Sequence, residues 1–244
     1  MTEGVFWLLP IGGRSLPEEE LYASCLGELE TVEINAYQTS SDRRLASLSR
    51  AAARVAASAM VGGRVRPKEW AFSRTTAGGR LLRASSGPQV SIGIADNEHI
   101  LAICADLTSC VGVDVESWQR PLGWRDTAER FFSRPERDLI QRLPDKEGSD
   151  VFTMLWTGKE ALAKANGAQL VDFLDLSLIG PDLRCSQGLW REGVAHEKWR
   201  VRWFDLGIAL VAICCEVGKP CRIPITVSCD WITGRLSRST WHTR

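Results

Sequence analysis

Apolar and polar positions along the chain follow two different periods, which predict a mixture of helices and strands. Apolar residues recur at steps of three and four across Asp42–Met60 and Val151–Ala165, and glycines follow both segments, so each predicts a helix. Shorter apolar runs predict strands at Val5–Ile11, Val90–Ala95, Ile100–Ala105, Val111–Val115, Trp199–Phe204 and Ile208–Cys215. The pattern therefore predicts an α+β protein.

Polar residues indicate where the predicted helices begin. Asp42 is placed to cap the first long helix. Ser133-Arg134-Pro135-Glu136 has the form of a capping box with proline in the first turn, so it predicts a helix start just after a short helix over Thr127–Phe132. Capping accounts for Glu136 fully, and a role as a ligand is the less favoured alternative.

Two short segments of the chain are similar in sequence. Leu101–Asp106 reads LAICAD and Val211–Glu216 reads VAICCE, at an offset of 110 residues. Because this offset is nearly half the chain, the repeat indicates two similar α+β halves related by a pseudo-twofold, with a ligand site in the cleft between them. We predict an N-terminal half over 1–110, a C-terminal half over 111–218 and an extension over 219–244, whose role the sequence does not indicate.

The composition narrows the classes of partner. The chain has 244 residues with 30 Lys and Arg against 30 Asp and Glu, so its overall charge gives no attraction to nucleic acid or to an anionic membrane. The longest strongly apolar run is far shorter than the roughly 20 residues of a membrane helix, and Met1–Pro10 lacks the pattern of a secretion signal. We expect a monomeric cytoplasmic protein with no nucleic-acid or membrane partner.

Eight cysteines and three histidines show no spacing typical of a metal site, and no Cys-x-x-Cys occurs. Cys104, Cys214 and Cys215 fall inside apolar runs, where a free thiol behaves as a small hydrophobe. We predict buried reduced thiols rather than disulfides.

The segment Val111–Glu116 alternates valines with Gly112, Asp114 and Glu116. Successive side chains of a strand point to opposite faces, so the two carboxylates share one face while the valines enter the core. Neighbouring carboxylates repel each other unless a cation lies between them, and oxygen ligands of this kind suit Mg²⁺. The alternative is an exposed strand edge with ordinary charges, and this segment alone does not decide between the two.

The segment Trp156–Lys164 places Trp156, Glu160 and Lys164 on one stripe of the second long helix. Glu160 and Lys164 have the favourable order for a helix ion pair, worth a few tenths of a kcal/mol, so a structural role would suffice for them. Gly158 in the helix interior costs about 1 kcal/mol relative to alanine, which indicates close approach by another group.

Three arginines, Arg43, Arg50 and Arg54, share one face of the first long helix. A solvated face is the favoured interpretation, and an anion-binding patch is the alternative.

The two acidic segments together resemble the signature of the Sfp-type 4′-phosphopantetheinyl transferases. That family carries a Gly-x-Asp-x-Glu strand and, some forty residues later, a Trp/Phe-x-x-Lys-Glu-Ala-x-x-Lys helix, and both are complete here. The linking segment Arg130–Glu136, the Asp42-Arg43-Arg44 start of the first helix, and the closing segments Trp203–Asp205 and Ile208–Cys215 are also similar to the family. The resemblance covers roughly residues 5–216 and implies two α+β halves related by a pseudo-twofold.

The resemblance implies transfer of 4′-phosphopantetheine from coenzyme A to a serine of an acyl or peptidyl carrier protein, with Mg²⁺ as cofactor. Asp114, Glu116 and Glu160 would hold the metal against the pyrophosphate. Glu160 would also take the proton of the serine hydroxyl, directly or through water. Lys164 would neutralise the leaving phosphate. The chemistry is positioning plus charge neutralisation.

The resemblance also implies contacts to the donor. Lys159 would touch a phosphate, and Arg44 and Arg80 would contact the nucleotide.

The chain departs from the family where an Asn-x-Ser-His-Ser-type motif normally supplies a histidine for the 3′-phosphate of coenzyme A. Ile94 stands at that position, and His99 lies five residues too late. We expect the small residues Ser91, Gly93 and Ala95 to form an apolar cleft wall there.

Two functions therefore remain open. The first is a transferase that discriminates poorly between coenzyme A and its analogue lacking the 3′-phosphate, unless Arg44 or Arg80 replaces the histidine. The second is a repurposed member of the fold, acting on another phosphorylated or carrier-tethered substrate or binding a carrier protein without catalysis.

Overall fold

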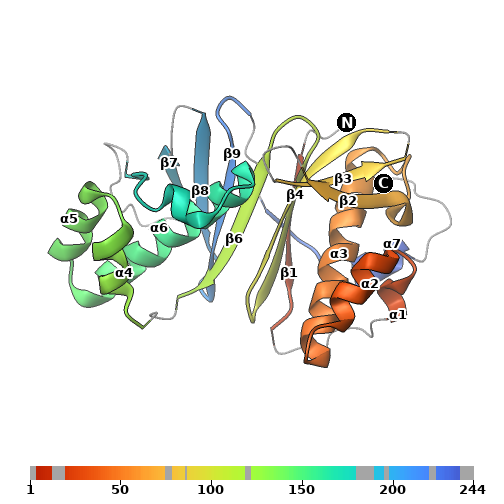
Figure 1. The fold of residues 1–244 in the computed structure, drawn as a ribbon, viewed down its shortest axis with the longest axis horizontal. Helices are drawn as coiled ribbons and strands as arrows, with labels where there is room; N and C mark the ends of the chain where they lie inside the picture. The colour runs from red at the N-terminus through yellow and green to blue at the C-terminus, as the bar shows by residue number, and fades with distance from the viewer. Residues whose placement is uncertain are drawn as a thin grey trace.

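The computed structural model describes residues 4–12, 20–74, 79–85, 87–118, 122–179, 190–194, 198–219 and 224–236. Two β-sheets face each other at the centre of the molecule, and helices cover the outer face of each (Figure 1). This arrangement confirms the α+β class predicted from the sequence pattern. Among the described residues, no helix is long and apolar enough to cross a membrane.

The first sheet has the strand order β10-β1-β5-β4-β3-β2. Its strands are β1 (Gly4–Pro10), β2 (Trp70–Arg74), β3 (Arg80–Ala84), β4 (Gln89–Asp96), β5 (Ile100–Asp106) and β10 (Ile225–Thr226). The helices on this side are α1 (Glu20–Ala23), α2 (Glu28–Asn35), α3 (Ser40–Met60), the short 3₁₀ helix η1 (Pro67–Glu69) and α7 (Cys229–Leu236). All of its strand pairs are antiparallel except β1 with β10.

Helix α3 packs its small residues against the first sheet and provides most of the apolar core there. Its N-cap is Thr39, whose hydroxyl accepts a hydrogen bond from the backbone N–H of Asp42 at 3.1 Å. Asp42 lies in the first turn, where its charge suits the helix dipole, and the prediction that it caps the helix was wrong. Gly62 and Gly63 end the helix with positive φ angles, as expected.

The second sheet has the strand order β6-β9-β8-β7, with all pairs antiparallel. Its strands are β6 (Val111–Ser117), β7 (Trp190–Val194), β8 (Trp199–Asp205) and β9 (Ala209–Glu216). The helices on this side are α4 (Trp124–Phe131), α5 (Arg134–Arg142), α6 (Asp145–Asn166) and the 3₁₀ helix η2 (Leu170–Phe173). Helix α6 packs directly against β6, β9 and β8.

The two sheets have equivalent topologies. The order β1-β5-β4-β3 in the first matches β6-β9-β8-β7 in the second, and α3 and α6 occupy corresponding places after the first strand of each set. The repeated sequence falls on β5 and β9, which are the second strands of the two sets. Its apolar pattern therefore marks the most enclosed strand of each half.

A shared apolar layer lies between the two sheets. Val111, Val113 and Val115 of β6 enter it, together with Phe6 of β1 and Phe204 of β8, whose rings meet edge to face at 5.4 Å. The valines therefore point into the core as predicted, and the opposite face of β6 is left for Asp114.

The chain after β9 returns to the first half. Strand β10 pairs in parallel with β1, and α7 packs against α3 and α1. Trp231 of α7 meets Trp7 of β1 edge to face at 5.1 Å. The sequence offered no interpretation of the extension, and the structure describes its residues 224–236 as part of the first half. The predicted boundary near residue 110 falls in the connection between β5 and β6.

The described cysteines carry free thiols, as predicted, but Cys110 and Cys229 are only partly buried. Burial raises the pKa of the Cys104 thiol to about 12, so this thiol stays protonated and serves as core. Cys185 and Cys221 lie outside the described residues.

Candidate active site

Strand β6 and helix α6 meet closely enough to bring their acidic and basic side chains together. A side chain at Gly112 would collide with the backbone of Ala161 and Ala165, so only glycine allows the strand to lie directly on the helix. Asp114 follows two residues later on the same face of β6, and therefore points toward α6 as well. The result is a polar site between an edge strand and a helix.

Lys164 connects the carboxylates of this site. Its Nζ lies 2.5 Å from Oδ1 of Asp114 and 3.5 Å from Oε2 of Glu160. The Asp114 side chain is only 7% exposed, and its second oxygen, Oδ2, is buried without a hydrogen-bond partner. A buried carboxylate oxygen without a hydrogen-bond donor lowers the folding stability. A ligand that contacts Oδ2 of Asp114 would remove this penalty.

The other two carboxylates, Glu116 and Glu160, are half-buried and carry unfavourable charge. Burial, followed by repulsion from Asp114 and Glu160, raises the pKa of Glu116 to about 7, against the stabilising effects of Lys164 and a hydrogen bond with Trp156. Burial and the Asp114 charge also raise the pKa of Glu160, while Lys164 opposes the shift. A cation bound at this site would therefore relieve the repulsion among the carboxylates.

These residues suit a divalent cation of the Mg²⁺ type. The donors are carboxylate oxygens, one of them is an unpartnered buried atom, and two carboxylates repel their neighbours. Within the described part of the chain, however, no three His, Cys, Asp or Glu side chains are arranged as a ready-made metal site. The ammonium group of Lys164 lies against Asp114, so the side chains would have to adjust around a bound cation.

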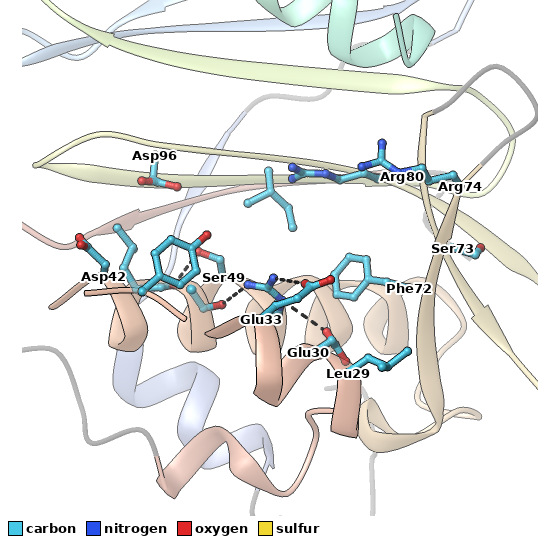
Figure 2. Close-up of a pocket in the computed structure, with 15 residues that line it drawn as sticks. Leu29, Glu30, Glu33, Asp42, Ser49, Phe72, Ser73, Arg74, Arg80 and Asp96 are labelled. Atoms are coloured by element: carbon cyan, nitrogen blue, oxygen red, sulfur yellow. Dashed lines mark hydrogen bonds and ion pairs between the residues drawn. The ribbon is translucent and has the colours of Figure 1, made fainter. Parts of the chain in front are cut away.

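A hollow of about 610 Å³ lies between α3, α2 and the strands β2, β3 and β4. Figure 2 shows Asp42 and Asp96 toward one end of it and Arg74 and Arg80 toward the other. Ile94 lines the same hollow, on the face of β4 that also carries Asp96. The hollow thus combines separated acidic and basic groups with an apolar surface between them.

Asp96 links this hollow to the carboxylate site. Its pKa is raised mainly by burial; Lys164 and Arg80 lower it, and Asp114 and Asp42 raise it further. Since such effects need charges close by, Asp96 lies within electrostatic reach of the residues on both sides. The hollow and the carboxylate site are therefore neighbours, and Asp96 interacts with charges of both.

Arg80 is the predicted donor-binding residue that lines the hollow. It is the cross-strand partner of Arg74 in the β2–β3 pair. Burial, with repulsion from Arg74 and Arg50, lowers the pKa of Arg80, although a guanidinium group remains charged at neutral pH. Two arginines placed opposite each other destabilise a free hairpin, and an anion bound between them would relieve this repulsion.

Arg44 lies half-buried in the first part of α3. The α3 residues that line the hollow are Asp42, Leu45, Ala46, Ser49 and Arg50, so the structure brings Arg80, and not Arg44, to that surface.

Lys159 does not reach this region. Its side chain is fully buried, and its Nζ lies 3.0 Å from Oε2 of Glu136, which is also fully buried. The ammonium group also donates to the backbone carbonyl of Leu176 and lies 5.0 Å from the Phe132 ring centroid. The predicted contact with a phosphate has no support in this position, because Lys159 joins α6 to α5 within the core.

Glu136 has the structural role that its capping box predicts. It accepts hydrogen bonds from the Ser133 backbone at 3.1 Å, the Ser133 hydroxyl at 2.8 Å and the Leu178 backbone at 2.9 Å. With Lys159 as its ion-pair partner, it is fully engaged and does not face the carboxylate site.

The small residues of β4 also lie elsewhere than expected. Gly93 faces Cys104 and Val113, and Ser91 accepts a hydrogen bond from the Val111 backbone at 3.2 Å. Together with Ala95 they pack between the two sheets, so the prediction of an apolar cleft wall on this face was wrong. Ile94, on the opposite face, is the apolar residue of the hollow.

Neither interpretation of the arginine face on α3 was correct for Arg50 and Arg54. Both arginines pair with carboxylates of α2 rather than facing solvent or a free anion site. Sequence reasoning missed Glu30, Glu33 and Asp96 as neighbours of the hollow. Helix α2 gave no apolar periodicity by which to place them, since only Ile34 of that helix is buried.

Comparison with known proteins agrees with this site. Residues 110–214, which include β6, α6 and their carboxylates, match the model of the 4′-phosphopantetheinyl transferase superfamily. Over this segment the chain is similar to that superfamily. A curated relative, 4′-phosphopantetheinyl transferase HetI of Nostoc sp. (strain PCC 7120 / SAG 25.82 / UTEX 2576), is 29% identical over 167 residues, which cover 66% of this chain and 67% of that protein.

Proposed function

We propose that this protein transfers the 4′-phosphopantetheine group of coenzyme A to a serine of an acyl or peptidyl carrier protein, with Mg²⁺ as cofactor. The observation that carries the proposal is the Asp114 carboxylate, which is bound by Lys164 through one oxygen and left without a partner at the other. The match of residues 110–214 to the superfamily model and the similarity to HetI support the same reaction.

Asp114, Glu116 and Glu160 would hold the cation. When bound, it would neutralise charge on the pyrophosphate of the donor and on the departing phosphate. Burial raises the pKa of Glu160, which would make this carboxylate a stronger base for the proton of the serine hydroxyl. The serine oxygen forms a bond to the phosphorus that carries pantetheine, the bond to the bridging oxygen breaks, and adenosine 3′,5′-bisphosphate leaves.

Lys164 has the position for charge neutralisation in this reaction. Its side chain is 38% exposed, so it can face a ligand while remaining paired with Asp114 and Glu160. Its ammonium group would neutralise charge on the leaving phosphate. The nucleotide would occupy the hollow beside Asp96, with Arg80 and Arg74 as its cationic contacts.

Donor binding tests this proposal without requiring a carrier protein. Coenzyme A should raise the melting temperature in the presence of Mg²⁺ and much less in excess EDTA. Asp114→Asn, which keeps the shape of the side chain, should remove this dependence on Mg²⁺, whereas the exposed residue Asp126 should tolerate the same change. Equal stabilisation by coenzyme A with and without metal would contradict the assigned metal site.

The repurposed-fold alternative keeps one supporting observation, the replacement of the family histidine by Ile94. Arg80 lines the same hollow and offers a cation for the nucleotide, which weakens that alternative. Binding of coenzyme A without transfer to any apo carrier protein would favour it.

A further inference from the structure

Helix α2 covers one side of the hollow without being held there by a core of its own. Ile34 is its buried residue, whereas Leu29 and Val32 are 81% and 69% exposed. Leu29, Glu30 and Glu33 nevertheless line the hollow. Polar contacts must therefore fix the position of this helix, since apolar burial is too small to do so.

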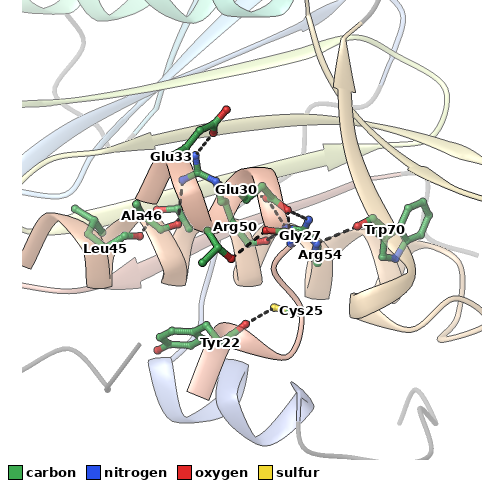
Figure 3. A network of polar contacts seen from close by, with 12 residues as sticks. Tyr22, Cys25, Gly27, Glu30, Glu33, Leu45, Ala46, Arg50, Arg54 and Trp70 are labelled. Atoms are coloured by element: carbon green, nitrogen blue, oxygen red, sulfur yellow. Dashed lines mark hydrogen bonds and ion pairs between the residues drawn. The ribbon is translucent and has the colours of Figure 1, made fainter. Parts of the chain in front are cut away.

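Arg54 of α3 makes the most buried of these contacts. Its side chain is 2% exposed, and its guanidinium group binds both carboxylate oxygens of Glu30, at 3.1 and 2.5 Å (Figure 3). Glu30 also accepts a hydrogen bond from the Gly27 backbone at 2.9 Å, which fixes the start of α2. A bidentate pair of this kind sets the orientation of the helix as well as its distance from α3.

The same guanidinium group also holds strand β2. Its Nε donates to the backbone carbonyl of Trp70 at 3.1 Å, and the group lies 4.9 Å from the Phe72 ring centroid. Phe72, Ser73 and Arg74 of β2 line the hollow opposite α2. Arg54 therefore connects α2 with β2, two walls of the hollow, although its own side chain does not line the hollow.

Arg50 adds a second, more exposed connection to α2. Its side chain is 20% exposed, and it pairs with Glu33 at 3.0 Å and with Glu30 at 3.5 Å. Because Arg50 lines the hollow, replacing it would change the surface as well as the position of α2. Arg54 does not line the hollow, so replacing it would change the position of α2 without changing a residue of the lining.

We infer that Arg54 is a positioning residue for the donor: it sets the distance between α2 and β2, and so the shape of the nucleotide hollow, through Glu30 and the Trp70 carbonyl. The inference rests on the proposed function, since it takes the hollow as the donor site. Lysine cannot replace Arg54, because a single ammonium group does not present the planar fork that binds Glu30 and Trp70 together.

The test compares Arg54→Lys and Glu30→Gln with Ile140→Ala, a buried substitution in the other half of the protein. Coenzyme A binding is measured by calorimetry with Mg²⁺ at a temperature where all three variants are folded. We expect Arg54→Lys to weaken binding about tenfold or more, and Glu30→Gln to weaken it less because the Trp70 contact remains. Ile140→Ala should lower the melting temperature and leave the dissociation constant unchanged.

Kinetics separate positioning from catalysis. Both Arg54→Lys and Glu30→Gln should raise KM for coenzyme A and leave kcat within about twofold, because neither residue touches the reacting atoms. The inference would be overturned if the wild type binds coenzyme A and Arg54→Lys binds it equally well, or if Ile140→Ala weakens binding as much as Arg54→Lys does. Either result would leave the proposed function standing. Failure of the wild-type protein to bind coenzyme A would overturn both.

Discussion

At the scale of single residues, the role of each charged side chain depends on the group with which it forms an ion pair or a hydrogen bond. Alternation along β6 was enough to predict that Asp114 and Glu116 share a face, and helical spacing was enough to pair Glu160 with Lys164. The closer pairing of Lys164 with Asp114 could not be predicted, because it depends on how β6 and α6 pack. For the same reason Lys159, next to Glu160 in sequence, proved to be a core residue.

Replacement of Lys164 distinguishes its two roles. If it served only as an ion-pair partner, Lys164→Ala would lower folding stability, because the buried carboxylate of Asp114 would lose its cation, and would leave the kcat of the folded protein unchanged. We expect a strong fall in the kcat of the folded protein as well, because the proposed mechanism uses Lys164 to neutralise charge on the leaving phosphate. Steady-state kinetics and thermal melting check this together. Lys146→Ala, which removes the exposed i,i+4 partner of Asp150 on the same helix, is the matched control.

Glu116 should make the metal-free protein less stable as pH rises. The folded pKa is about 7, above the ordinary value of 4.5, so folding favours the protonated form and stability is lost between these two values. In EDTA, Glu116→Gln should therefore have a higher melting temperature than wild type at pH 8 and nearly the same at pH 4. The exposed Glu147→Gln serves as control. A pH-independent difference would contradict the electrostatic explanation.

At the scale of elements, the long helices and most strands were predictable because their apolar periods are strong. Helix α2, with one buried residue, gave no such signal, and neither did the edge strand β10 of two residues. The cost of Gly158 did indicate close approach, but Trp203 and Leu178 of the core make that approach rather than a ligand. Local sequence shows that a helix is tightly packed without showing what packs there.

Gly112→Ala tests the contact between β6 and α6. An added methyl group meets the α6 backbone, which cannot move aside as a side chain can, so we expect a loss of about 1–3 kcal/mol or more. The shift should also separate Asp114 from Lys164 and lower activity beyond the loss of folded protein. Denaturant unfolding and kinetics on the folded fraction are the measurements. Gly234→Ala in α7, where a methyl group meets nothing within 4 Å, should be neutral or stabilising.

At the scale of the whole molecule, the repeated sequence correctly indicated two similar sheets, because it marks the enclosed strands β5 and β9. The hollow was not predictable, since its walls come from α2, α3 and three strands, with Arg54 joining two of them from behind. The expectation of poor donor discrimination left open that Arg44 or Arg80 replaces the histidine. Arg80 of β3, in the same hollow as Ile94, changes that expectation.

Arg80 should supply the preference for coenzyme A over its analogue lacking the 3′-phosphate. A charge-assisted hydrogen bond to a phosphate is worth about 1.5–3 kcal/mol, or roughly 10- to 150-fold in kcat/KM. Arg80→Ala should lower kcat/KM for coenzyme A by this factor and change the analogue much less, and Arg83→Ala on the same strand is the control. Equal loss with both donors would assign Arg80 to another part of the nucleotide.

The central claim, transfer of phosphopantetheine at the Asp114 site, is tested most directly by the intact mass of an apo carrier protein after incubation with this protein, coenzyme A and Mg²⁺. A panel of apo acyl and peptidyl carrier proteins should include at least one that gains the mass of a single phosphopantetheine group. The gain should disappear when the carrier serine is replaced by alanine, when EDTA is in excess, or when Asp114→Asn replaces the wild type. An unchanged carrier mass across a panel that a known transferase modifies, or an undiminished gain with Asp114→Asn, would contradict the account.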